Sequence, residues 1–559
     1  MNICKSTAIA LCVGTMMVAA DGARAAAFFK PAGGAASGYW DDVANWWSNE
    51  SGTTALDSLP KSTEVLIYAP GVTAIVTNDI PTLAGYARNN ALAVGTTTAG
   101  SQSMLIIKDH GVVKTVSTDI GGVKSGTGRS GVLVVEAGGS LTSLTGEFSI
   151  GKENGFGIIT NAGTITASHD ITIGVGAGGY GRWVQDGGNA RPTSSVTHNI
   201  YVGADGQGEI IVKSGVFSGG NYAAGYDSQG IVAIGGTNTV TSRVEVQEGA
   251  TFKNGFWYVG GYPGHPKGRG EIALRGGAIC CGAQMGRRDS LFLGAYRDGA
   301  ETIDGDCFGA IRGWGVITNI PEVTRYNGIQ VLLGNGEIVA DGEGFARELD
   351  FSQVFQVTNA LVGVSGNTSG WRAMRKGVAK MPFSYLFGAG SAVSGAKCVG
   401  CSMDGARPDL VNSIRVELTR SGYSGKECYA YAELYAADRD DVHLDELKGE
   451  VSVLGAWKVG TFTGTAAEDE NKVLSALSAK LSFRYDQTKV QKPGSSIELH
   501  KYDSAEGKWT RLTRLEAAQV PADYVIESPA GLANTGETFN LGLFAVVESF
   551  HSPTVLSIR

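Results

Sequence analysis

The segment Ile171-Thr172-Ile173-Gly174 returns as Ile200-Tyr201-Val202-Gly203, and this repetition decides the fold. The shared phrase is an apolar residue, any residue, a second apolar residue and a glycine. An imperfect copy ends in Gly121, and the other full copies end in Gly95, Gly151, Gly235, Gly260 and Gly294. The spacings between the eight glycines are 26, 30, 23, 29, 32, 25 and 34 residues. The alternation predicts short strands with one buried face, and each glycine predicts a tight corner.

A second phrase falls between most copies of the first and reads apolar, x, apolar, x, x, glycine. Repeats of 20 to 50 residues that contain two or three short strands indicate a solenoid or a propeller. A propeller blade needs four strands in about 40 residues or more, whereas these units are shorter and vary in length. The pattern therefore predicts a parallel β-helix (β-solenoid), in which insertions leave at the corners while the stacked strands keep their register.

This interpretation specifies which side chains point inward. Stacking of the second phrase places two sets of apolar residues in neighbouring inward columns. The first column is expected to contain Leu133, Ile210, Val244 and Ile272, and the second Val135, Val212, Val246 and Leu274.

The flanks of the repeat region, residues 91–300, differ from it in composition. Residues 28–90 contain Trp40, Trp46 and Trp47 and are expected to cap the open end of the solenoid; the alternative is that these tryptophans stack on sugars. Residues 301–385 are expected to be terminal coils. From 386 to 559 glycine is rarer and longer alternating strands predict a β-sandwich. A short helix is expected at Asp469–Ala479, because Leu474, Leu477 and Leu481 share a face.

Residues 1–27 have the features of a secretory signal peptide. Lys5 precedes the apolar run Ile9–Ala20, small residues follow, and cleavage is expected near Ala25 or Ala27. An oxidising compartment then favours disulfides among the six remaining cysteines, Cys280, Cys281, Cys307, Cys398, Cys401 and Cys428. The Cys398–Cys401 CxxC pair is expected to form a local disulfide or to bond to Cys428. A zinc site is not expected, because no second pair or histidine cluster stands at ligand spacing.

The phrase from Trp40 to Trp46, followed by the glycine-ending repeats, resembles the passenger regions of bacterial autotransporter-type surface proteins. The resemblance covers residues 38–300 and implies a right-handed β-helix that serves as an adhesin, a matrix protein or a carrier. The chain departs from that family because no membrane β-barrel is expected after residue 387. The stretch from Leu481 to Val547 resembles a sandwich module at the ends of many bacterial secreted multidomain proteins, which implies fold and secretion only.

No catalytic, cofactor-binding or metal-binding site is predicted. The repeat region's acidic residues occupy different phases of the repeat and are not expected to converge as a hydrolase requires. The densest acidic pairs, Asp41-Asp42 and Asp304-x-Asp306, are expected to be solvated turns, and Asp170 beside His169 a corner. There is no Gly-x-Ser-x-Gly elbow and no GxxxxGK[ST] loop.

Three hypotheses about function follow. The favoured one is a secreted or cell-surface structural, adhesin-like scaffold without enzymatic activity. The alternatives are a carbohydrate-binding or polysaccharide-cleaving β-helix, and a carrier targeted by its C-terminal sandwich. The expected partner is a surface or matrix polysaccharide or another surface protein. The net charge of −8 and the absence of any Lys/Arg run argue against nucleic acid, and no apolar stretch after the signal peptide is long enough for a membrane helix.

Overall fold

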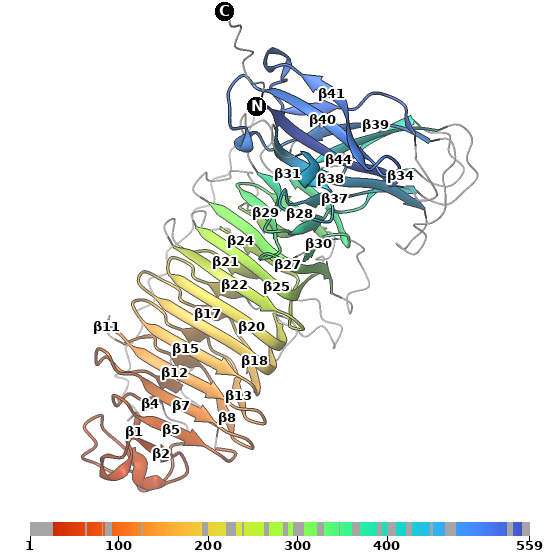
Figure 1. Cartoon of the computed structure of the whole chain (residues 1–559). Helices are drawn as coiled ribbons and strands as arrows, with labels where there is room; N and C mark the ends of the chain where they lie inside the picture. The colour runs from red at the N-terminus through yellow and green to blue at the C-terminus, as the bar shows by residue number, and fades with distance from the viewer. Residues whose placement is uncertain are drawn as a thin grey trace, which may run out of the picture.

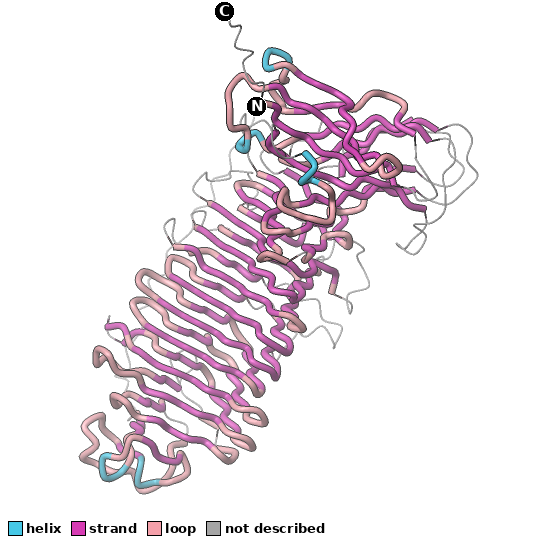
Figure 2. The backbone as a smooth tube through the Cα atoms, viewed as in Figure 1, coloured by secondary structure: helices cyan, strands magenta, loops and turns pink. Residues whose placement is uncertain are grey.

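The computed structural model shows an elongated stack of strands that ends in a broader C-terminal module (Figure 1). It describes residues 26–61, 64–80, 82–83, 92–124, 127–192, 199–219, 231–236, 240–261, 268–282, 289–294, 307–320, 329–345, 347–359, 369–387, 394–399, 410–420, 428–447, 451–463, 477–533 and 540–550. Strands dominate these residues (Figure 2), which also form short 3₁₀-helices but no α-helix. The all-β class expected from the repeat is confirmed.

The first repeated phrase forms one sheet of the stack. Within the described residues this sheet has thirteen strands, paired in parallel except for the first pair. In spatial order they are β3 (Trp46–Trp47), β1 (Ala27–Phe29), β4 (Val65–Ile67), β6 (Leu92–Val94), β9 (Thr118–Ile120), β14 (Phe148–Ile150), β17 (Ile171–Ile173), β19 (Ile200–Val202), β21 (Ile231–Ile234), β24 (Phe256–Val259), β26 (Asp289–Leu293), β28 (Ile329–Leu333) and β31 (Val354–Asn359).

The second phrase forms the coil strands of a larger sheet, which has 24 strands among the described residues. These coil strands pair in parallel with their counterparts one coil away. They are β2 (Ser37–Tyr39), β5 (Thr73–Val76), β7 (Ser103–Ile107), β8 (Val112–Thr115), β12 (Ser130–Val135), β13 (Ser140–Ser143), β15 (Phe156–Asn161), β16 (Thr164–Ala167), β18 (Tyr180–Pro192), β20 (Gln207–Ser218), β22 (Thr241–Gln247), β23 (Thr251–Asn254), β25 (Arg269–Cys281), β27 (Phe308–Asn319), β29 (Gly336–Asp341), β30 (Glu348–Asp350), β32 (Gly370–Met374) and β33 (Val378–Lys380). Stacking thus extends on both sides of residues 91–300.

Strand register confirms both inward columns. The first contains the four expected residues, with Ile159 and Trp183 between Leu133 and Ile210, all fully buried. The second contains two unexpected amides, Asn161 and Gln185. The Asn161 amide donates to Gln185 Oε1 at 3.0 Å, and the indole of Trp183 donates to the same oxygen at 3.1 Å. Buried amides are tolerated here because they bond to each other.

The glycine corners are places where the next coil comes too close for a side chain. Gly151 and Gly174 have φ of 62° and 61°, in the left-handed region. A Cβ on either residue would also collide with a carbonyl oxygen of the following coil, that of Tyr180 or Gln207. Glycine is therefore required twice over, by backbone conformation and by coil spacing.

Aromatic residues fill the N-terminal end of the stack. Trp40 and Trp46 are buried and meet edge to face at 4.6 Å between ring centroids. The Trp46 indole donates to the Trp40 carbonyl at 2.7 Å, and Phe29 packs on the other side of Trp46. Strand β3 runs antiparallel to β1 at this end of the sheet. This packing is that of an end cap.

The C-terminal module continues the larger sheet and adds a second one. Strand β33 pairs antiparallel with β37, so the backbone ladder passes from the coils into the module. The continuing strands are β34 (Ser384–Phe387), β37 (Cys428–Tyr435), β38 (Val451–Thr463), β44 (Asn540–Ser549), β40 (Ser496–Asp503) and β41 (Lys508–Leu515). The second sheet contains β35 (Ser394–Val399), β36 (Ile414–Arg420), β39 (Leu477–Arg484), β42 (Val525–Glu527) and β43 (Leu532–Ala533).

The two antiparallel sheets of this module pack face to face. Phe483 on β39 contacts Trp457 on β38 and Phe544 on β44, with ring centroids 5.1 and 5.3 Å apart. The short helix expected at Asp469–Ala479 is wrong at its C-terminal end, because Leu477–Ala479 begin β39 and pair with β36. Residues 464–476 lie outside the described residues.

Candidate functional site

The tryptophans of the N-terminal cap are not arranged to receive a sugar. Trp40 and Trp46 are buried, and the half-buried Trp47 donates its indole N–H to the Lys30 carbonyl at 2.8 Å. Asp41 and Asp42 are exposed turn residues. Asp42 accepts from the Ala44 amide at 3.0 Å, and Asp41 accepts from Asn78 at 3.0 Å. These residues serve the local turn and the cap.

The structure describes one of the two further acidic candidates, Asp170. The Asp170 carboxylate accepts the backbone N–H of Asn199 at 2.8 Å, which fixes the start of the next coil. Asp304 and Asp306 lie outside the described residues. In the part of the chain that is described, no three His, Cys, Asp or Glu side chains form a group that could hold a metal ion.

The expectation that the acidic residues fall at different phases is wrong for one column. Glu209 and Glu271 flank Arg243 in the register of β20, β22 and β25. The sequence does not show this shared position, because the corners between the strands differ in length. The acids alternate with arginines: Arg243 bridges Glu245 and Glu271, Arg312 bridges Glu271 and Glu337, and Arg372 bridges Glu337 and Asp486. Each carboxylate is therefore paired with a cation, which is unlike a hydrolytic pair.

No disulfide joins Cys280, Cys281, Cys307 and Cys398, the cysteines whose side chains the structure describes. All four are buried. Burial raises the pKa of the Cys281 thiol well above its usual value, which keeps the thiol protonated and unreactive. Cys401 and the side chain of Cys428 lie outside the described residues, so the expected CxxC disulfide stays a prediction.

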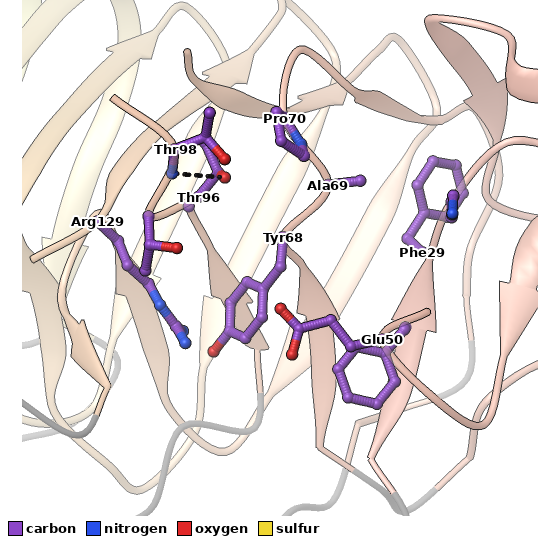
Figure 3. Close-up of a pocket in the computed structure, with 12 residues that line it drawn as sticks. Phe29, Glu50, Tyr68, Ala69, Pro70, Thr96, Thr98 and Arg129 are labelled. Atoms are coloured by element: carbon purple, nitrogen blue, oxygen red, sulfur yellow. Dashed lines mark hydrogen bonds between the residues drawn. The ribbon is translucent and has the colours of Figure 1, made fainter. Parts of the chain in front are cut away.

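A cavity lies on the outer side of the thirteen-stranded sheet, beside the N-terminal cap. Its volume is about 250 Å³. Tyr68, directly after β4, and Arg129, directly before β12, form its inner wall, and Thr96 and Thr98 after β6 form one side (Figure 3). Sequence reasoning missed this cavity, because its residues come from consecutive coils and none belongs to a recognised motif.

Arg129 is the central polar group of this cavity. Its side chain is nine-tenths buried, and its guanidinium lies over the Tyr68 ring, 3.6 Å from the ring centroid. Its Nε has no hydrogen-bond partner. Figure 3 shows the Tyr68 ring between Arg129 and Glu50. Burial raises the pKa of Tyr68, so this phenol stays neutral.

Asp119 lies behind this arginine, in the middle of β9. Register places it in an outward column directly after Leu66 and Ala93, which are buried and apolar. Burial in these surroundings raises the pKa of Asp119 to about 7, although Arg129 and Lys152 act in the opposite direction. Near neutral pH this carboxyl is therefore only partly ionised and balances only part of the Arg129 charge.

No family model, curated protein or solved structure matches this chain. Among the described residues there is also no helix with the length and apolar character needed to cross a bilayer.

Proposed function

We propose that this chain is a secreted scaffold of the cell surface or extracellular matrix, an adhesin-like protein that acts through its length and surface. In this proposal the stacked coils are a right-handed parallel β-helix of the autotransporter-passenger kind, and the C-terminal module is a β-sandwich. The N-terminal segment serves as the secretory signal.

The continuous 24-stranded sheet carries this proposal. It extends from the N-terminal cap through every described coil into the C-terminal module. The interior of the stack is filled by side chains such as Trp183, Phe217 and Phe252, which form one packed core rather than a channel. An architecture of this kind provides a long rigid surface, which suits a scaffold.

The competing hypothesis of a polysaccharide-cleaving enzyme has less support. Of the three tryptophans that suggested sugar stacking, Trp40 and Trp46 are buried in the cap and Trp47 is half-buried. The acids that share a column are each paired with arginine. The hypothesis of a carrier is favoured by one feature, since β41 pairs only with β40 among the described strands and presents an edge.

Three measurements test the scaffold role. Small-angle scattering of the purified mature protein should give an elongated rod, and immunolabelling of intact cells should find the protein at the surface. The protein should also release neither reducing ends nor unsaturated sugars from a panel of neutral and anionic polysaccharides, with and without calcium. Turnover of any of these substrates would contradict the proposal.

A further inference from the structure

We propose that the cavity lined by Tyr68, Arg129, Thr96 and Thr98 binds the carboxylate of an acidic sugar residue, a uronate. This inference does not depend on the scaffold role, because it concerns a ligand site that either an inert scaffold or an adhesin could contain. Its basis is the chemistry of the cavity wall.

Arg129 supplies the group that recognises the anion. A guanidinium binds carboxylates with two parallel hydrogen bonds when it is held in a fixed orientation. Stacking on Tyr68 provides that orientation, with 3.6 Å between the guanidinium carbon and the ring centroid. The lining includes a second cation, Lys30, whose ammonium donates to the Ser51 carbonyl at 3.0 Å. The one lining acid, Glu50, is exposed.

The remaining lining fits a polyhydroxylated ring. Thr96, Thr97 and Thr98 bring hydroxyl groups that can both donate and accept hydrogen bonds. Phe28 on β1 and Tyr68 directly after β4 add aromatic carbon to this lining. A cavity of about 250 Å³ holds a small ligand rather than a folded partner.

The surroundings of Arg129 leave room for an additional negative charge. Asp119, whose charge interacts with Arg129, is only partly ionised near neutral pH, because burial raises its pKa to about 7. A second carboxylate, that of Glu64, interacts with Tyr68. Other charged groups that act on Asp119 are Glu147 and Lys152, which bond to each other at 3.0 Å. Protonation of Asp119 leaves the guanidinium to be balanced by a ligand, so uronate affinity should rise as the pH falls from 8 to 6.

Calorimetric titration of the mature full-length protein tests this site with D-glucuronate, D-glucose and acetate as probes. Glucuronate should bind, and glucose should bind at least about tenfold more weakly, because it lacks the carboxylate. Acetate should also bind more weakly, because it makes no contact with the threonines. If glucose or acetate bound as tightly as glucuronate, the assignment to an acidic sugar would be overturned.

Variants separate the site from general stability. Arg129→Gln should lower glucuronate affinity at least about tenfold, whereas Arg191→Gln, a change at an exposed arginine away from the cavity, should leave it unchanged. Thr98→Val alters an exposed lining residue and should lower affinity several-fold even if Arg129→Gln fails to fold. Asp119→Asn should abolish the difference in affinity between pH 6 and pH 8. Unchanged binding by folded Arg129→Gln, or by Thr98→Val, would contradict the proposal.

Discussion

The guanidinium Nε of Arg372 lies 3.3 Å from the Oδ2 of Asp486, and this contact joins the coils to the C-terminal module. Arg372 belongs to β32, whereas Asp486 follows β39 in the second sheet. Asp486 is almost fully buried, and its Oδ1 caps a 3₁₀-helix by accepting the Thr488 amide. The column of alternating arginines and acidic residues therefore ends at this pair, between the coils and the C-terminal module.

The first prediction concerns this junction. Arg372→Met keeps the apolar part of the side chain but removes the guanidinium from beside a buried carboxylate, so we expect a loss of about 3 kcal/mol in unfolding free energy. Urea denaturation measures the change. The control is Lys508→Met, which breaks an exposed pair with Glu506 and should cost less than about 0.5 kcal/mol. Equal losses of unfolding free energy in the two variants would show that the junction pair stabilises the protein no more than an exposed ion pair does.

The second prediction concerns the inward column. Val246→Asp places a carboxylate in the fully buried core and should cost several kcal/mol or prevent folding. The neighbouring Glu245→Ala removes a partly exposed ion pair with Arg243 and a hydrogen bond that its carboxylate accepts from the Gln247 amide at 2.8 Å, and should cost no more than about 1 kcal/mol. Thermal unfolding followed by circular dichroism compares the two. Similar melting shifts would contradict the assignment of inside and outside.

The third prediction separates backbone conformation from coil spacing. Gly151 and Gly249 both have positive φ, 62° and 76°, but only a Cβ on Gly151 would meet the next coil. Gly249→Ala should cost about 1 kcal/mol, from the left-handed conformation alone. Gly151→Ala should cost clearly more in the same denaturation experiment, because the coil of Tyr180 must move. A smaller loss for Gly151→Ala than for Gly249→Ala would refute the close-approach argument.

The fourth prediction follows from Asp119. The folded-state pKa of about 7 exceeds the usual value for aspartate, so the folded protein holds a proton that the unfolded chain releases between pH 4 and pH 7. The stability contributed by this group should fall as the pH rises through that window, by at most about 1.4 kcal/mol per pH unit. Denaturation of wild type and of Asp119→Asn at pH 5, 6, 7 and 8 measures this contribution, because the variant should lack the pH dependence that Asp119 gives to the unfolding free energy. Parallel pH curves would rule out a raised pKa.

The fifth prediction concerns the mature N-terminus. The Ala27 amide donates to the Glu64 carbonyl at 2.8 Å, and Ala27 pairs with Val65 in the sheet. Cleavage after Ala25 preserves these contacts, whereas cleavage after Ala27 removes them and shortens β1. For the signal cleavage proposed above, we therefore expect the processed protein to begin at Ala26. Intact-mass measurement of the secreted form checks this, and a first residue of Phe28 would contradict it.

The sequence was most informative where the chain repeats itself. The phrases ending in Gly151 and Gly174 predicted the strands, the corners and the stacking of the strands on one another. These features could be predicted because the two-residue alternation and the glycine at each corner are visible within a few residues of sequence. Asn161 and Gln185 were missed, because a search for apolar columns passes over amides that satisfy each other. The cavity was missed for a different reason. Tyr68 and Arg129 are distant in sequence, and only the exact register of the coils brings the Tyr68 ring under the Arg129 guanidinium.

Strand pairing at the junction has a mechanical consequence. Along the coils, two sheets of parallel backbone hydrogen bonds connect each coil to the next. Among the described strands, the thirteen-stranded sheet ends at β31, and the crossing into the C-terminal module uses the larger sheet, through β33 and β37, with one further bridge between Gly370 and Val411. Fewer strand pairings therefore resist a pulling force at this crossing than between two coils, and we expect the rod to part there before any coil opens.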